Sequence, residues 1–165
     1  MPPETDNLRL EELYAGDQKD REGVLSTQQQ VEQLRSRDSA RRKEVFEMIT
    51  GGNVNTVNDL YRAAVIMLHG AEPKEFLTAH RLAVMASVNG HKPARWLAAA
   101  SLDRFLMSIG LPQTYGTQFE HNPEDGRYQL RLPIDDSAIL HFEKRFFNVP
   151  PVIERLAQLN RKMGS

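Results

Sequence analysis

Apolar residues recur at helical spacing along most of the chain, and this periodicity predicts a mainly α-helical fold. The periodic stretches cover residues 7–15, 26–50, 57–69, 74–88 and 94–109. The stretch over 57–69 is apolar on nearly every side, so we expect that helix to lie at the centre of the fold.

Turn residues predict where the first two helices end. Gly16 is expected to end or loosen the first helix, and the pair Gly51-Gly52 to end the second. Within 26–50, a polar run at 36–39 leaves open whether the stretch forms one amphipathic helix or two.

The composition changes after residue 115, where the pattern predicts a β-hairpin. Residues 118–121 and 127–132 have the character of strands, and they flank a turn near Asp125-Gly126. Further on, Asp135 or Asp136 can cap a helix. We expect that helix to reach about residue 147, and a last helix to follow the prolines at 150 and 151 and end near residue 161.

Two glycines suggest an internal repeat. Gly52 and Gly90 open equivalent turns 38 residues apart, and an Ala-rich apolar helix follows each. A period in this range is typical of helical repeats. Residues 39–69 and 74–109 therefore resemble two helix-turn-helix units of the Sel1-like or tetratricopeptide class. We expect one domain over 1–165, with a repeat-like core at 39–109 and a hairpin and helical tail at 110–165.

Composition narrows the partners and the compartment. The net charge of −1 gives no basic surplus for nucleic acid or for a membrane surface, so neither partner is expected. The absence of cysteine excludes disulfides and thiol catalysis. Without an apolar run of about 20 residues, the chain is expected to be soluble. The predicted location is the cytoplasm, or outside it if an upstream signal was removed.

One predicted helix carries two adjacent charges, Asp103 and Arg104, in otherwise apolar surroundings. Neighbours on a helix point about 100° apart, so these two cannot satisfy each other. Burial costs each ion several kcal/mol, whereas one contact at about 4 Å returns roughly 4 kcal/mol, so each needs several hydrogen bonds. The polar residues that we expect to supply them are Asp17, Arg21, Gln113, Thr117 and Gln118.

The segment after this helix, QTYGTQ at 113–118, is rich in amide and small side chains. Gly116 permits a positive φ or close approach of the backbone to a ligand. The amides of Gln113 and Gln118 both donate and accept, which suits a carboxamide, a peptide backbone or a carbohydrate. The alternative is a turn that caps the preceding helix and fixes the hairpin.

Histidines offer the main acid–base candidates. His69 ends the central helix, where an imidazolium interacts well with helix carbonyls, and a general base is the alternative. A metal site through His69, His80 and Asp103 is the weaker possibility, because the spacing is not that of a ligand set. No metal and no cofactor is expected, since phosphate-loop, dinucleotide, zinc-protease and EF-hand motifs are absent from the sequence.

Several motifs occur in a recognisable order: DQKDR at 17–21, DSARR at 38–42, TVNDLYRAA at 56–64, LHG at 68–70, AHRLA at 79–83, RWLAAASLDRFL at 95–106, PQTYGTQF at 112–119 and NVP at 148–150. This set resembles the DUF6624 family of uncharacterised bacterial proteins over nearly the whole chain. The resemblance implies that the family's polar motif positions are Asp17, Gln18, Arg21, His69, Asp103, Arg104, Gln113, Gly116, Thr117 and Gln118. It brings no established activity with it.

Three functions fit these observations. The leading hypothesis is a helical binding module for a polar small molecule or a peptide, whose pocket contains Asp103, Arg104, Gln113, Thr117 and Gln118. The second is a small acid–base enzyme of the hydrolase or transferase type, with His69 or Asp103 as the acid–base group and Arg21 or Arg104 holding an anionic or tetrahedral species. The third is a protein–protein scaffold without a ligand.

Overall fold

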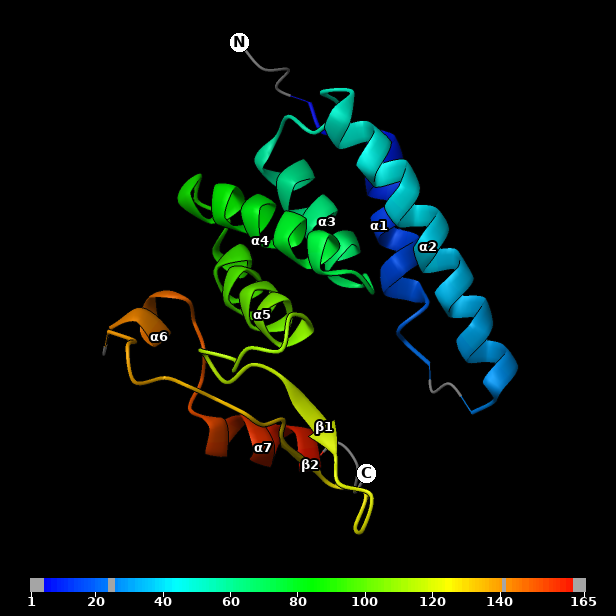
Figure 1. Ribbon diagram of the computed structural model, residues 1–165. Helices are drawn as coiled ribbons and strands as arrows, with labels where there is room; N and C mark the ends of the chain where they lie inside the picture. Colours follow the sequence, from blue (N-terminus) through cyan, green and yellow to red (C-terminus); the bar gives the residue numbers. More distant parts are fainter. Residues whose placement is uncertain (1–4, 24–25, 141, 162–165) are drawn as a thin grey trace.

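The computed structural model describes residues 5–23, 26–140 and 142–161, and this part of the chain is mainly helical with one short hairpin (Figure 1). The prediction of the fold class is confirmed. The elements are α1 (Leu8–Lys19), α2 (Gln28–Thr50), α3 (Val57–Leu68), α4 (Pro73–Val88), α5 (Lys92–Ser108), β1 (Phe119–His121), β2 (Tyr128–Leu130), α6 (Glu143–Phe146) and α7 (Val152–Arg161). None of the described helices is long and apolar enough to cross a bilayer.

Helices α1 and α2 lie side by side and run in opposite directions (Figure 1). Gly16 does not end the first helix, which continues to Lys19. A side chain at Gly16 would touch the guanidinium of Arg41 on α2, so the glycine makes room for a neighbour. The second helix is unbroken, and Asp38 within the expected break is buried against Arg21 and Arg41. The polar run at 36–39 is therefore part of the contact with α1.

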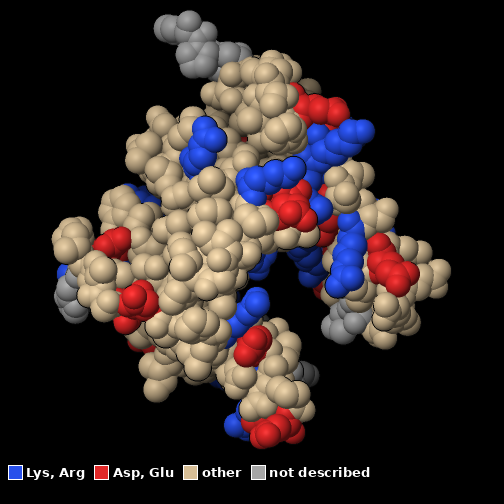
Figure 2. Space-filling model, viewed as in Figure 1, with Lys and Arg blue, Asp and Glu red and all other residues tan. Residues whose placement is uncertain are grey.

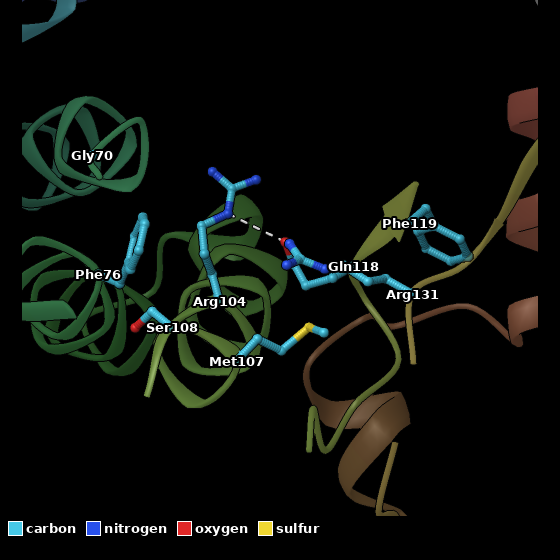
Figure 3. A pocket seen from close by; sticks show the side chains of 8 residues that line it. All are labelled: Gly70, Phe76, Arg104, Met107, Ser108, Gln118, Phe119 and Arg131. Atoms are coloured by element: carbon cyan, nitrogen blue, oxygen red, sulfur yellow. Dashed lines mark hydrogen bonds between the residues drawn. The ribbon is translucent and has the colours of Figure 1, made fainter. Parts of the chain in front are cut away.

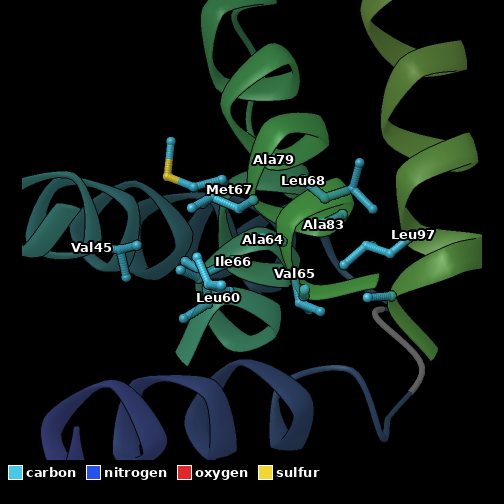
Figure 4. Close-up of a cluster of buried hydrophobic side chains, with 14 of the residues drawn as sticks. Val45, Leu60, Ala64, Val65, Ile66, Met67, Leu68, Ala79, Ala83 and Leu97 are labelled. Atoms are coloured by element: carbon cyan, nitrogen blue, oxygen red, sulfur yellow. The ribbon is translucent and has the colours of Figure 1, made fainter. Parts of the chain in front are cut away.

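The central position predicted for α3 is confirmed. Thr56 and Asp59 form a reciprocal capping box at its start, and the helix is buried on most sides. The main hydrophobic core surrounds it (Figure 4), with fully buried side chains from α1, α2, α4 and α5. Its largest members include Leu10, Val45, Leu60, Ile66, Met67, Leu82 and Leu97.

Alanines allow α4 to pack closely on its neighbours α3 and α5. Ala79, Ala83 and Ala86 on α4 have no exposed surface, and neither do Ala94 and Ala98 on α5. Small residues at such contacts let helix backbones approach, whereas added methylenes have no space. The pairing of α4 with α5 agrees with the predicted second unit, but α3 packs more extensively against α4 than against α2.

Replacing Ala83 by leucine is expected to lower the free energy of unfolding by about 2 kcal/mol, because three extra carbons must enter a filled contact. Urea denaturation measures the loss. Ala40→Leu on the exposed face of α2 is the matched control and should change stability by less than about 0.5 kcal/mol. Equal effects at both positions would show that the α4 contact has room to spare.

The tail after the hairpin is less helical than expected. The helix predicted from Asp135 or Asp136 to residue 147 is wrong, because only the four residues of α6 are helical. Asp135 Oδ1 instead accepts hydrogen bonds from the backbone N–H and the hydroxyl of Ser137, at 3.1 and 2.6 Å, which closes a local turn. The backbone N–H of Asp135 also donates to the carbonyl of Gln113. The backbone here is tied to the loop at residue 113 and does not continue into a helix.

The hairpin and the last helix agree with the predictions. β1 and β2 pair antiparallel, with Phe119 opposite Leu130, and the turn contains Gly126 at positive φ. Helix α7 lies against β2 (Figure 1), where the Asn160 amide both accepts from and donates to the backbone of Tyr128, at 2.8 and 3.1 Å. The tail thus packs on the hairpin, and it also meets α5, where the guanidinium carbon of Arg95 lies 4.9 Å from the centre of the Phe146 ring.

Candidate functional site

Asp103 is fully buried on α5, and its carboxylate holds the loop that follows the helix. Oδ1 accepts from the backbone N–H groups of Thr114 and Tyr115, at 2.7 and 2.9 Å. Oδ2 accepts from the backbone N–H and the hydroxyl of Thr117, at 3.0 and 2.7 Å. With four donors the charge is satisfied inside the protein. Asp103 is therefore a structural anchor in this arrangement, and it presents no free oxygen to a ligand.

Gln113 and Gly116 also serve the loop. The Gln113 side chain is fully buried, accepts from the backbone N–H of Gln118 at 2.9 Å, and donates to the carbonyls of Gln118 and Arg131. Gly116 has a positive φ of 77°, as expected, but a side chain there would meet Val152 at 3.1 Å. The close approach is to α7 and not to a ligand. Gln113 and Gly116 therefore belong to a turn that fixes the hairpin, which was the alternative to a ligand-binding loop for this segment.

Arg104 points away from Asp103, as their adjacent positions predict. Its Nε donates to Gln118 Oε1 at 3.2 Å, and Nη1 donates to the carbonyl of Leu68 at 2.8 Å. The guanidinium carbon lies 5.8 Å from the centre of the Phe76 ring. No carboxylate of the described residues pairs with it. Burial lowers the pKa of the Arg104 guanidinium, and the nearby charges of Arg131 and Arg21 lower it further.

A cavity of about 370 Å³ opens beside this guanidinium (Figure 3). Its wall combines two cations, an amide and several apolar side chains: Gly70, Phe76, Arg104, Met107, Ser108, Gln118, Phe119 and Arg131. Arg131 reaches from the end of the hairpin toward Gln118, and among the residues that the structure describes it has only a loose ion pair with Glu120, at 3.9 Å. The cavity thus has a surplus of positive charge.

The space-filling view shows Lys and Arg side chains beside an open hollow between the α1–α2 pair and the hairpin, with Asp and Glu side chains among them (Figure 2). The arginines on the α1–α2 side are paired with carboxylates: Arg21 with Asp17 and Asp38, Arg41 with Asp20 and Asp38, and Arg42 with Glu75. The positive charge available to an anion is therefore that of Arg104 and Arg131 at the cavity.

A second polar cluster lies where α1 meets the end of α3. Asp17 is almost fully buried, and its Oδ1 lies 2.9 Å from His69 Nδ1 and 2.8 Å from Arg21 Nη1. Its Oδ2 accepts from Gln18 Nε2 at 2.8 Å. Arg21 also donates to Asp38 on α2 at 2.8 Å. Four predicted site residues therefore do come together, but around Asp17 and not around Asp103.

The two clusters adjoin each other without merging. The expectation that Asp17 and Arg21 would be bonded to Asp103 or Arg104 is wrong, because Asp17 and Arg21 are bonded to His69 and Asp38 instead. His69 nevertheless sits next to the cavity. Arg104 binds the carbonyl of the preceding residue, and the following residue, Gly70, lines the cavity wall.

The weak possibility of a metal site has no geometric support. His80 Nδ1 is 2.9 Å from the carbonyl of Ala98, and Asp103 is used by the loop. In the part of the chain that the structure describes, no three His, Cys, Asp or Glu side chains are grouped so that they could hold a metal ion.

Sequence reasoning missed several residues of these clusters. Phe76 and Arg131 line the cavity, and Asp38 and Arg41 extend the Asp17 cluster along α2. The spacing of Asp38 and Arg41, three residues apart on a helix, could have indicated an ion pair. Nothing in the local pattern around Arg131 distinguishes it from other exposed arginines, because its role depends on how the hairpin folds back.

Comparison of the chain with known protein families, with curated proteins and with solved structures finds no match. The resemblance to DUF6624 therefore rests on the quoted motifs alone. The function has to be argued from the chemistry of the cavity and of the adjoining cluster.

Proposed function

We propose that the protein is a binding module for a small organic anion, which occupies the cavity beside Arg104. The observation that carries the proposal is a partly buried guanidinium with no carboxylate partner among the described residues. A cation removed from water without a counter-charge is costly, so an anion that enters the cavity recovers part of that cost.

The hydrogen-bonding capacity of Arg104 supports an anionic ligand. A guanidinium has five N–H donors, and within the described part of the chain only Nε and one donor of Nη1 are used. The remaining donors match the paired oxygens of a phosphate or carboxylate group. Gln118 fixes the orientation of the guanidinium, since its own amide is tied to the carbonyl of Ala100 at 3.1 Å.

The rest of the wall suits an organic portion of the ligand. Phe76 and Met107 provide apolar surface, while Arg104 and Arg131 supply the charge. A volume of about 370 Å³ lies within the range of small-molecule sites. This combination favours a small molecule with one anionic end over a peptide backbone or a neutral carbohydrate.

The DUF6624 motif positions are consistent with this proposal. They divide into residues that hold the loop, such as Asp103, Gln113 and Thr117, residues that line the cavity, Arg104 and Gln118, and residues of the adjoining cluster, such as Asp17 and His69. We propose that membership of this family and the anion site go together, because the first two groups shape the cavity and the third lies beside it.

Calorimetric titration with inorganic phosphate and with a dicarboxylate tests the site. Replacing Arg104 by glutamine is expected to weaken binding by about 10- to 100-fold, since charge-assisted hydrogen bonds contribute roughly 1.5–3 kcal/mol. Arg127→Gln is the matched control, because it removes the same charge from an exposed position in the hairpin turn. If both substitutions weaken binding equally, the loss comes from the change in net charge and not from a site at Arg104, and the proposal is wrong.

A further inference from the structure

His69 and Asp17 have the arrangement of an acid–base pair. The imidazole Nδ1 lies 2.9 Å from Asp17 Oδ1, and Asp17 is held in turn by Arg21 and Gln18. A carboxylate in this position fixes the tautomer and the orientation of the ring and stabilises the imidazolium.

The other ring nitrogen is available for proton transfer. The His69 side chain is 23% exposed, whereas the Asp17 side chain that faces Nδ1 is 1% exposed. The accessible edge of the ring is therefore the one that carries Nε2. Among the described residues Nε2 makes no hydrogen bond, and it is not among the buried atoms that lack a partner.

His69 also lies at the edge of the anion cavity. Arg104 donates to the carbonyl of Leu68, the residue before His69. Gly70, the residue after His69, lines the cavity wall. Arg21, which is bonded to Asp17, is close enough to Arg104 for its charge to lower the pKa of that guanidinium. The acid–base pair thus lies next to the cavity, and only the neighbour Gly70 belongs to the cavity wall itself.

From this geometry we propose that the cavity is an active site for the hydrolysis of phosphate monoesters, with His69 as the general acid–base group. The inference rests on the proposed anion site. A phosphate monoester carries close to two negative charges at neutral pH, which Arg104 and Arg131 together neutralise, whereas a single carboxylate leaves one cation unpaired. The organic part lies against the apolar wall.

The reaction uses water as the only co-substrate. The oxygen of a water molecule forms a bond to phosphorus, and the bond from phosphorus to the ester oxygen breaks with its electron pair staying on that oxygen. His69 Nε2 takes a proton from the attacking water, and a proton from the imidazolium or from solvent completes the alcohol. Arg104 and Arg131 stabilise the charge on the other phosphoryl oxygens, and no redox change occurs.

Asp17 is a positioning residue in this scheme. It holds Nδ1, so its effect reaches the substrate only through His69. Asp17→Asn keeps an oxygen for the hydrogen bond but removes the charge that stabilises the imidazolium. It is expected to lower kcat while leaving KM unchanged, because Arg104 and Arg131 still bind the phosphate. A purely structural role for Asp17 would instead affect binding and folding without this split.

The test measures hydrolysis of p-nitrophenyl phosphate, and phosphate binding is measured in parallel. His69→Gln is expected to lower kcat by about 100-fold or more, while the Kd for phosphate changes less than threefold. His121→Gln, on the exposed hairpin, is the matched control and should keep full activity. Added imidazole should restore part of the activity of His69→Ala, which a loss of folding would not allow. Arg104→Gln, purified in the same way, reports any contaminating phosphatase.

The outcomes separate the two proposals. If the protein binds phosphate but does not accelerate hydrolysis of p-nitrophenyl phosphate or of phosphoserine, the reaction is wrong and the binding module stands. If hydrolysis occurs but survives in His69→Gln, the assignment of His69 is wrong. If neither phosphate binding nor hydrolysis is found, both proposals fall together.

Discussion

Replacing Asp103 by alanine is expected to lower the free energy of unfolding by about 4 kcal/mol, the largest effect of any substitution considered for this chain. The side chain is fully buried and accepts four hydrogen bonds, so its loss leaves the donors of Thr114, Tyr115 and Thr117 without a partner. Buried donors without an acceptor cost roughly 1–3 kcal/mol each, and partial relaxation of the loop recovers some of this. Urea denaturation followed by circular dichroism measures the loss, which corresponds to a fall in Tm of about 10 °C.

Two further variants test whether Asp103 anchors the loop through its hydrogen bonds. Asp103→Asn keeps one acceptor oxygen but places an NH2 group against the donors of Thr117, so about half of the loss is expected. Glu124→Ala, in the exposed hairpin turn, is the control for removing an acidic side chain and should stay within about 0.5 kcal/mol of the parent. A value for Asp103→Ala within 1 kcal/mol of the parent would contradict the anchoring role. Because of that role, substitutions of Asp103 report on folding and are unsuited to testing ligand binding.

The second large effect is expected at Asp17, where alanine should lower the free energy of unfolding by about 3 kcal/mol. Asp17 is 1% exposed and is bonded to His69, Arg21 and Gln18. Its removal leaves Arg21 and His69 without the carboxylate that faces them. Breaking a buried ion pair costs roughly 3–5 kcal/mol, and the lower figure applies because Arg21 keeps Asp38. Thermal and chemical denaturation measure the loss.

A double-mutant cycle separates this ion pair from its surroundings. Asp17→Ala and Arg21→Ala together should cost less than the sum of the single losses, because the second substitution removes a charge that the first has left unpaired. Glu22→Ala, exposed just beyond α1, is the control for charge removal and should have little effect. Strict additivity would indicate that Asp17 and Arg21 contribute independently, contrary to the geometry.

Much of the fold follows from periodicity and capping. The burial of α3 was evident from its apolar surface, and the turns at Gly52, Gly90 and Gly126 all have positive φ. Two of the differences between prediction and structure share one cause. Gly16 and the polar run at 36–39 look like helix ends in isolation, but each makes room for or pairs with a residue on the partner helix. Tertiary contacts of this kind are not encoded in local spacing.

The candidate site was likewise predictable only in part from the sequence. That Asp103 and Arg104 require separate partners follows from helix geometry, and the structure supplies them on opposite sides of α5. Which partners they have depends on chain segments far apart in sequence. Arg104 is bonded to the end of α3, and Arg131 approaches it from the hairpin. Only the folded arrangement reveals that one charge is satisfied and the other is not.

Segments from both halves of the chain meet beside the cavity. Asp17 lies on α1 and Arg21 follows that helix, whereas Arg104 and Arg131 come from α5 and from the end of the hairpin. Removal of α1, for instance by a protease that cuts ahead of α2, would strip His69 of its carboxylate and would also take the buried Leu10 and Leu13 out of the core. A fragment without α1 is therefore expected to lose stability together with the acid–base pair, so truncation does not separate folding from activity.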